Sequence, residues 1–523
     1  MCTACPIVEA QSPYHRHVSS RPKHSSDRGR PSLPARGGAS ASRRASGPPA
    51  AGENTKAAPL DDHARHAVIR VLVRQARLYP EFDLTAMERI VEGSGNTEEE
   101  PEASVLSDLD RAFAHAIYDA VVRRWLTLEF LIQRSLTQQF SELEPRLKAV
   151  LLAASAQILF MDKVPTHSAI NHAVEWAKRV IRPGAGAFAN AVLRKVALLK
   201  PEEGAARRER YTDLRDELPM PDGSAMTLTE ACLPENDMQR LAVATSHTIG
   251  LLRHWLNVGA PIREVRRLAL HSIVRPPTIL NTAYIRAPLP ASGHTLVPHE
   301  LPGSHVSLGS GAELAALLSI RTDLWVQDPA SSLAVKSIAH LRPSLILDLC
   351  AGQGTKTRQL AATFPNAKVV ATDVDATRFG RLQRAFGGSA QVSVLAPKEI
   401  RAKFIGKADL ILLDVPCSNT GVLARRPEAR YRFDIEHLNA VQDTQKQIIA
   451  DAMLLLLNQS PTSRGKILYS TCSLEQEENQ KQAAWADKWH KLGVSREHRH
   501  LPTGEPGDPA HRYTDGSFAA LLG

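Results

Sequence analysis

The sequence is poor in aromatic residues, in cysteine and in long hydrophobic runs. Aromatic side chains make up 5% of its residues, so the hydrophobic cores must rest on aliphatic side chains. No apolar run reaches the about 18 residues that a membrane-spanning helix needs, so no membrane partner is expected. The six cysteines are too sparse for a disulfide framework, which favours a reducing cytoplasm. Cys2 and Cys5 form a CxxC pair without the second pair of ligands that zinc requires, and no metal is expected.

Positive charge is concentrated at the N-terminus. The net charge of the chain is +9, and residues 1–60 hold nine Lys and Arg against three Asp and Glu. Residues 1–57 are rich in Ser, Pro, Gly, Ala and Arg and have no hydrophobic period, which predicts a disordered basic tail. Such a tail suits polyanion binding or organelle targeting, or it is only a solvated leader.

Residues 61–200 have the hydrophobic period of helices and predict an all-α domain without a catalytic constellation. Ser107 offers an N-cap, and the acidic stretch 92–102 predicts a loop. The expected helices cover residues 64–78, 107–136 (one helix or two), 143–161, 169–180 and 187–199, with a turn at 183–186.

Residues 201–325 are less regular and predict a linker followed by a small α/β insert. Residues 202–222 are charged and interrupted by Pro, which predicts a linker or an exposed helix. Two short amphipathic helices are expected at 247–256 and 262–272, and an extended segment begins at Arg275.

Residues 326–523 predict a mostly parallel, doubly wound α/β sheet of the Rossmann type. An apolar strand at 345–349 runs into a turn that contains Gly352 and Gly354, and a helix follows. The next strand, 368–372, ends at Asp373, about 20 residues after the turn, where an acid can accept the hydroxyls of a ribose. These features together indicate a nucleoside pocket.

Two cysteines follow two successive strands of this sheet. Strand 408–413 leads to Asp414 and Cys417, and strand 466–470 leads to Cys472, with a helix expected at 435–457. Adjacent parallel strands lie about 5 Å apart, so both thiols should emerge side by side at the ligand-binding edge. A disulfide is disfavoured in a reducing compartment, and zinc lacks further ligands at suitable spacing, which leaves nucleophilic catalysis. One thiolate that adds to C6 of a pyrimidine activates C5 towards an electrophilic methyl group, and a second group then removes the C5 proton.

Several motifs resemble those of bacterial 16S ribosomal RNA cytosine-5 methyltransferases of the Sun/Fmu type. In the catalytic half they are CAGQGTKT (350–357), DVPCSNTGVLARRPEARYRF (414–433), YSTCSLEQEEN (469–479) and the terminal DGSFAALL. In the N-terminal half, GAFANAVLRKV (186–196) is similar to a helix of the family's N-terminal domain, which is like the antitermination factor NusB. The resemblance implies a NusB-like RNA- or protein-binding domain at 61–200 and an S-adenosylmethionine-dependent catalytic domain at 326–523.

Residue roles follow from the resemblance. It implies that Cys472 attacks C6, that Cys417 assists release of the covalent adduct, and that Asp414 holds the edge of the cytosine. The residues that it implies for S-adenosylmethionine are Cys350, Ala351, Gly352, Gln353, Gly354, Thr355, Lys356, Asp373 and Asp414. The residues expected to contact RNA are Lys356, Arg275, Arg425, Arg426 and Arg430; the alternatives for the arginines are a Pro-rich turn and a solvated basic loop.

The sequence departs from the family pattern in the cofactor loop. Gln353 replaces a proline and Thr355 a glycine, and Ala396 stands where the family has an acid. The prediction is therefore a monomeric, cytoplasmic RNA cytosine-5 methyltransferase that acts on 16S ribosomal RNA, with S-adenosylmethionine as cofactor and RNA as partner. The alternatives are a catalytically weak RNA-binding or antitermination factor, a transfer-RNA cytosine-5 methyltransferase, and a methyltransferase for proteins or small molecules.

Overall fold

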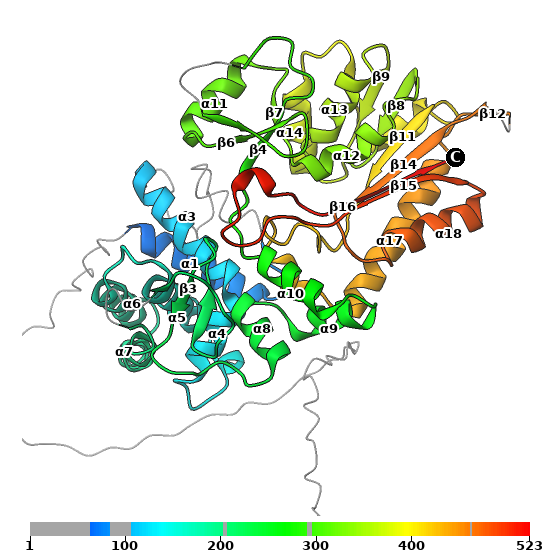
Figure 1. Cartoon of the computed structure of the whole chain (residues 1–523). Helices are drawn as coiled ribbons and strands as arrows, with labels where there is room; N and C mark the ends of the chain where they lie inside the picture. Colours follow the sequence, from blue (N-terminus) through cyan, green and yellow to red (C-terminus); the bar gives the residue numbers. More distant parts are fainter. Residues whose placement is uncertain (1–62, 84–105, 202–206, 290–294, 461–462) are drawn as a thin grey trace, which may run out of the picture. The chain divides into compact units, whose positions relative to one another are not determined.

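The computed structural model describes residues 63–83, 106–201, 207–289, 295–460 and 463–523 (Figure 1). The predicted disordered tail, its CxxC pair and the acidic stretch 92–102 lie outside these residues. Within the described residues, no helix has the length and apolar character that a bilayer crossing demands.

The N-terminal half is the predicted all-α domain. Its helices are α1 (His63–Leu78), α3 (Asp108–Arg123), α4 (Trp125–Gln133), α5 (Pro145–Phe160), α6 (Thr166–Val180) and α7 (Pro183–Ala197), with a short 3-10 helix at Phe140–Glu142. Helix α5 packs against α1, α6 and α7 and is buried on almost every face, so it is the central helix rather than an amphipathic surface helix. The predicted N-cap is confirmed, because the Ser107 hydroxyl accepts the backbone N–H of Asp110 in a capping box.

The structure decides one open prediction in this domain and corrects another. The segment expected to be one helix or two forms two, which are separated at Arg124. The expected turn at 183–186 is instead the first turn of α7. Pro183 begins this helix, where its missing N–H costs nothing and its fixed φ favours helix entry.

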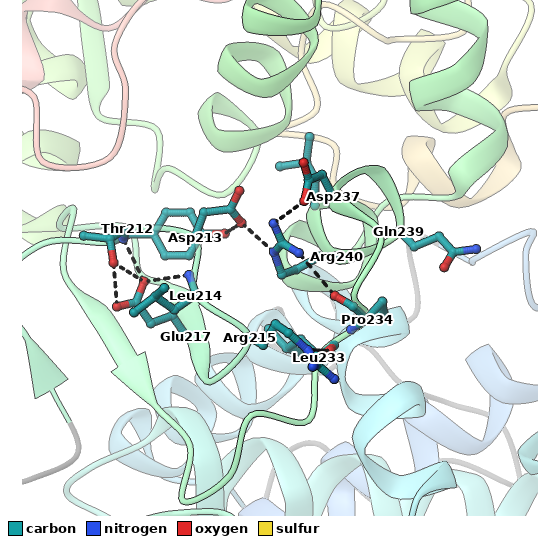
Figure 2. Close-up of polar contacts among 12 residues, drawn as sticks. Thr212, Asp213, Leu214, Arg215, Glu217, Leu233, Pro234, Asp237, Gln239 and Arg240 are labelled. Carbon is teal, nitrogen blue, oxygen red and sulfur yellow. Dashed lines mark hydrogen bonds and ion pairs between the residues drawn. The ribbon is translucent and has the colours of Figure 1, made fainter.

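The segment predicted as a linker is a packed three-stranded sheet in its described part. Strands β1 (Arg207–Arg208) and β2 (Glu217–Pro219) flank β3 (Ala225–Thr227). The fully buried Glu217 accepts the N–H of Thr212 at 2.7 Å and that of Leu214 at 3.3 Å (Figure 2). It also pairs with Arg208. A buried carboxylate with these donors organises a charged segment that has no hydrophobic period of its own.

Helices and a second small sheet follow. The helices are α8 (Asp237–Thr245), α9 (Ile249–Asn257) and α10 (Ile262–His271), and Arg240 of α8 pairs with Asp213 and Asp237 (Figure 2). The sheet has the order β5-β6-β4-β7, and α11 (Gly311–Ile320) precedes its last strand. Its strands are β4 (Thr278–Asn281), β5 (Leu296–Pro298), β6 (Ser304–Ser307) and β7 (Trp325–Val326).

The C-terminal half is the predicted mostly parallel, doubly wound sheet. Its strand order is β10-β9-β8-β11-β14-β16-β15. The strands are β8 (Leu345–Asp348), β9 (Lys368–Ala371), β10 (Val392–Val394), β11 (Leu410–Asp414), β14 (Lys466–Thr471), β15 (Val494–His500) and β16 (Ser517–Leu522). All pairs are parallel except those made by β16, which runs antiparallel to both neighbours. A short hairpin, β12 (Asn458–Ser460) and β13 (Ser463–Arg464), precedes β14.

Both faces of this sheet are covered, because apolar residues alternate along its strands. Leu347, Ile411 and Ile467 face α17 (Ile435–Met453) and α18 (Gln480–His490). Ile346, Leu412 and Leu468 face α12 (Pro329–Ser337) and α13 (Thr355–Thr363), and Figure 1 shows the two pairs of helices on opposite sides. The remaining helices are α14 (Ala376–Phe386), α15 (Pro397–Lys403), α16 (Ala429–Arg432) and a 3-10 turn at Ala510–Arg512.

The loop after β11 packs into the helical domain. Tyr431 of α16 is buried in the core of that domain, near the rings of Tyr79 and Phe82. Its hydroxyl donates to the Val122 carbonyl of α3 at 2.6 Å, and Arg123 donates to the Ala424 carbonyl at 2.6 Å. The segment that carries Cys417 at its start is therefore anchored by α3 at its far end.

The carboxylate of Glu217 should be needed for the stability of the β1–β3 sheet. Glu217→Ala removes the acceptor of the Thr212 and Leu214 N–H groups and one of the two carboxylate partners of Arg208. We expect the free energy of unfolding to fall by about 1–3 kcal/mol. Urea unfolding monitored by circular dichroism measures this loss. Glu235→Ala, which removes an exposed partner of Arg215, should change it by less than about 0.5 kcal/mol. Equal urea midpoints for the two variants would contradict this role of Glu217.

Candidate active site

The carboxyl ends of β8 and β11 form the centre of the candidate site. The strand order reverses at this pair, because β9 and β10 lie on one side of β8 while β11 and β14 lie on the other. Open α/β sheets bind ligands outside the carboxyl ends of the strands at such a switch point. The glycine turn follows β8, and Asp414 ends β11.

The glycine turn and the helix after it leave backbone groups accessible to a polar ligand. The Asp373 carboxylate accepts the N–H of Gly352 at 2.9 Å and that of Asp375 at 2.9 Å, which joins the turn to the end of β9. Gly352 has φ +57, and a Cβ atom placed there would meet nothing within 4 Å, so the backbone borders open space. Gly354 precedes α13, whose first turn has no side-chain cap within the described residues. An uncapped helix N-terminus offers N–H donors to a ligand.

Three charged side chains line the strand ends. Lys356 pairs with Asp414 at 2.8 Å. Burial lowers the pKa of Lys356, but the carboxylate of Asp414 and its hydrogen bond outweigh this effect, so the lysine pKa is raised above its usual value. Asp348 is fully buried and accepts the Thr357 hydroxyl at 2.7 Å. Burial raises the pKa of Asp348 to about 7, and its second oxygen, Oδ1, has no hydrogen-bond partner in the described structure.

The two predicted cysteines meet as free thiols. Strands β11 and β14 pair in parallel with Asp414 opposite Ser470, and the Sγ atoms of Cys417 and Cys472 lie 3.3 Å apart. This separation is a thiol–thiol hydrogen bond, since a disulfide measures about 2.05 Å. The hydrogen bond that the Cys417 thiol makes with Cys472, together with burial, raises the pKa of Cys417 well above its usual value. Cys417 therefore remains a thiol at neutral pH, and the pair presents two non-equivalent sulfur atoms.

Two residues that sequence reasoning missed hold this pair in place. Cys472 donates to Asn419 Oδ1 at 3.2 Å, and the same side chain donates from Nδ2 to the Cys417 carbonyl at 2.8 Å. The N–H of Gly421 donates to the Cys472 carbonyl at 2.9 Å, and a Cβ atom at Gly421 would lie 2.6 Å from that oxygen. Both residues belong to the stretch SNTG directly after Cys417, a turn-forming composition that could have indicated a tight loop.

The arginines expected to contact RNA separate into two groups. Arg275 and Arg426 are exposed and remain candidates. Arg430 needs correction: it is fully buried and donates to the carbonyls of Thr245 and Ser272. Arg425 is half-buried, and its guanidinium pairs with Asp515 at 2.6 Å and Asp328 at 3.0 Å. These two guanidinium groups join parts of the protein to one another, so they are not free to bind phosphate.

The residues expected at the methyl donor differ in accessibility. Gln353 is exposed, Thr355 and Lys356 are half-buried, and Ala351 is buried. The half-buried Cys350 has its pKa raised by burial and by the nearby Asp348. Ala396, where the sequence lacks the acid of the family pattern, is the residue directly before α15. Its methyl side chain supplies no carboxylate.

Comparisons with known proteins agree with this architecture. Residues 338–522 match the family described as 16S rRNA methyltransferase RsmB/F, and residues 62–198 match the NusB family. A ribosomal RNA small subunit methyltransferase B from Xanthomonas campestris pv. campestris is 26% identical and covers 79% of this chain and 89% of that protein. Its counterpart from Citrobacter koseri is 29% identical, with 72% and 82% covered.

A solved structure has the same fold over most of the chain. The crystal structure of PH0851 superposes with a TM-score of 0.62 at 20% identity and covers 87% of this chain and 98% of that chain. At this identity the match supports the fold and does not by itself assign the chemistry.

The raised pKa of Cys417 can be measured by alkylation. In Cys472→Ala the thiol–thiol hydrogen bond, the largest cause of the shift, is lost, so we expect the pH midpoint for alkylation of Cys417 by iodoacetamide to fall. Mass spectrometry of each cysteine gives these midpoints. Cys350 is the internal control, because Cys472 is not among the causes of its shift. An unchanged Cys417 midpoint in the variant would refute the coupling of the two thiols.

Proposed function

We propose that the chain, whose residues 338–522 match the 16S rRNA methyltransferase RsmB/F family and whose residues 62–198 match the NusB family, methylates C5 of a cytosine in 16S ribosomal RNA. The observation that carries this proposal is the pair of free thiols 3.3 Å apart at the carboxyl edge of the sheet. Methylation of an oxygen or nitrogen atom needs no covalent adduct. A pyrimidine C5 needs one thiolate to form the adduct and a second group to resolve it.

Cys472 is the nucleophile in this proposal. Its thiolate adds to C6, and the electron pair of the C5–C6 double bond moves to C5. There it would take up the methyl group, while the bond from the donor to that methyl breaks and the donor keeps the bonding pair. Cys417, a thiol at rest, first gives its own proton to solvent, and the thiolate that results takes the C5 proton. The C5–C6 double bond re-forms, the bond between C6 and sulfur breaks, and Cys472 leaves with that electron pair. The charge of a thiolate at Cys472 raises the pKa of Lys356, so the lysine remains an ammonium group that stabilises the anion.

Asp414 and Lys356 are proposed to face the base. Their ion pair sits at the end of β11, three residues before Cys417. The carboxylate can accept the amino group of cytosine, which uracil lacks, and this contact would distinguish the two bases. The buried Asp348, with a pKa of about 7, is about half protonated at neutral pH, and its protonated form adds a donor close to this pair.

The glycine turn fits a methyl donor of the nucleoside type. S-adenosylmethionine supplies the electrophilic methyl group when it is bound. The residues proposed to hold it are Cys350, Ala351, Gly352, Gln353, Gly354, Thr355, Lys356, Asp373 and Asp414. The open space at Gly352 and the uncapped start of α13 support this assignment despite the altered loop positions 353 and 355.

RNA would be bound over several parts of the chain, which we propose acts as a monomer in the cytoplasm. The half-buried thiols can reach a base only after it is unpaired or flipped from a helix. Arg426 and Arg275 are the exposed arginines near the site loop and the middle sheet, and their charge suits the phosphate backbone. The NusB-family domain favours ribosomal RNA over transfer RNA.

Trapping of the covalent intermediate tests this chemistry. We expect Cys417→Ala to accumulate a covalent protein–RNA complex, visible as a slower band on a denaturing gel, because the adduct forms and does not resolve. Cys472→Ala should form none and should lose methyl transfer by about a thousandfold or more. Cys232→Ala, at a buried cysteine in the middle segment, is the matched control and should behave as wild type.

Absence of both methyl transfer and adduct in wild type and Cys417→Ala would favour the non-catalytic alternative, an RNA-binding factor that keeps the methyltransferase fold. Methylation of transfer RNA in preference to 16S ribosomal RNA would favour the second alternative. Bisulfite sequencing of ribosomal RNA from a deletion strain identifies the modified cytosine, which should lose its methyl group in that strain.

A further inference from the structure

One buried carboxylate is hydrogen-bonded to the residues that directly follow both cysteines. Glu478 belongs to the loop between β14 and α18 and is fully buried. Its Oε1 accepts the N–H of Ser418 at 2.8 Å and the amide Nε2 of Gln445 at 3.0 Å. Its Oε2 accepts the hydroxyl of Ser473 at 2.6 Å and that of Ser418. All four partners are donors, so the contacts match an ionised carboxylate.

The partners of Glu478 are adjacent to the cysteines. Ser418 follows Cys417, and Ser473 follows Cys472, so one side chain joins the two turns that carry the thiols. Gln445 of α17 also donates to the carbonyl of Pro416, directly before Cys417, at 3.0 Å. The chain thus places a carboxylate where it sets the spacing of two turns from different strands.

The charge of Glu478 distinguishes the two sulfur atoms. It contributes to the raised pKa of Cys417, after the larger effects of the Cys472 hydrogen bond and of burial. Burial raises the pKa of Glu478 itself, and Glu475 adds to this, whereas the bonds from Ser418 and Ser473 lower it. The other titratable neighbour is Tyr469 of β14, whose raised pKa keeps it neutral. The charge of Lys356, in contrast, interacts with Cys472.

We propose that Glu478 is a positioning residue that fixes the spacing of the two thiols and keeps Cys417 protonated, so that Cys472 is the sulfur that attacks the base. The assignment of nucleophile and resolving thiol rests on the proposed function. Glu478 itself touches neither cysteine sulfur by a hydrogen bond and acts through Ser418, Ser473 and its charge. The Glu478 anion acts on Cys417 and the Lys356 ammonium acts on Cys472, and these opposite charges make the pair asymmetric.

Alkylation tests the charge effect without any need for methyl transfer. Removal of a nearby anion lowers a thiol pKa, so in Glu478→Gln the pH midpoint for alkylation of Cys417 should fall. In Glu478→Asp, which keeps the charge on a shorter side chain, the midpoint should remain close to that of wild type. Equal midpoints in wild type and folded Glu478→Gln would overturn the proposal, whatever the substrate of the protein proves to be.

Kinetics test the positioning effect. We expect kcat for RNA methylation to fall about tenfold or more in Glu478→Gln and in Glu478→Asp, with KM for RNA and for S-adenosylmethionine changed less than about twofold. The rate of adduct release should rise with pH, and the midpoint of this rise should move to lower pH in Glu478→Gln but not in Glu478→Asp. Glu217→Gln alters another fully buried carboxylate, in the β1–β3 sheet, and should reduce stability without a shift of either pH profile.

Two outcomes distinguish a failure of the proposed function from a failure of the proposed role of Glu478. A wild-type protein that methylates no cytosine, together with a shifted Cys417 midpoint in Glu478→Gln, overturns the proposed function and leaves the role of Glu478 standing. If Glu478→Gln does not fold, Ser473→Ala cuts one link and retains the carboxylate, and it should lower kcat with little change of KM. An unchanged kcat in Ser473→Ala would overturn the positioning role.

Discussion

The parallel pairing of β11 with β14 is the constraint on which the candidate site depends. Its register sets Asp414 opposite Ser470, so the residues that follow the two strands leave the sheet at the same edge. A slip of two residues would separate the thiols by about 7 Å. Two further contacts hold the turns that follow these strands. Gly421 packs against the Cys472 carbonyl, and Glu478 joins Ser418 to Ser473. With both in place, the two sulfur atoms lie 3.3 Å apart.

A second set of contacts fixes the same loop from outside the sheet. Arg430 donates to carbonyls of α8 and of the residue after α10, and Tyr431 is buried within the helical domain. In the sequence, Arg430 and Tyr431 belong to a stretch that resembles a basic surface loop. In the structure, both side chains are buried and join separate parts of the chain by hydrogen bonds. Their full burial explains why the loop needs hydrogen-bond acceptors from three different parts of the chain.

Much of this arrangement could be predicted from the sequence, and the misses share a physical cause. The strands at 345–349 and 466–470, the doubly wound sheet and the adjacency of Cys417 and Cys472 follow from apolar runs and spacing. Glu478 and Arg430 were missed or misjudged because burial of a charge depends on partners that lie far away in sequence. Glu217 was missed although its partners are near in sequence, because only the fold of the turn brings them to one carboxylate. The turn expected at 183–186 was wrong because Pro starts a helix as well as it ends one.

Tyr431 is buried against α3 and near the rings of Tyr79 and Phe82, all of which precede it in sequence. This has a consequence for synthesis on the ribosome. The chain emerges from its N-terminus, so the helices that receive this tyrosine are complete before residue 431 is made. The receiving surface is made before the loop, whereas β16 follows both of its neighbours in sequence and can insert between β14 and β15 only after both have been made. The order of assembly therefore runs from the helical domain to the closing of the sheet.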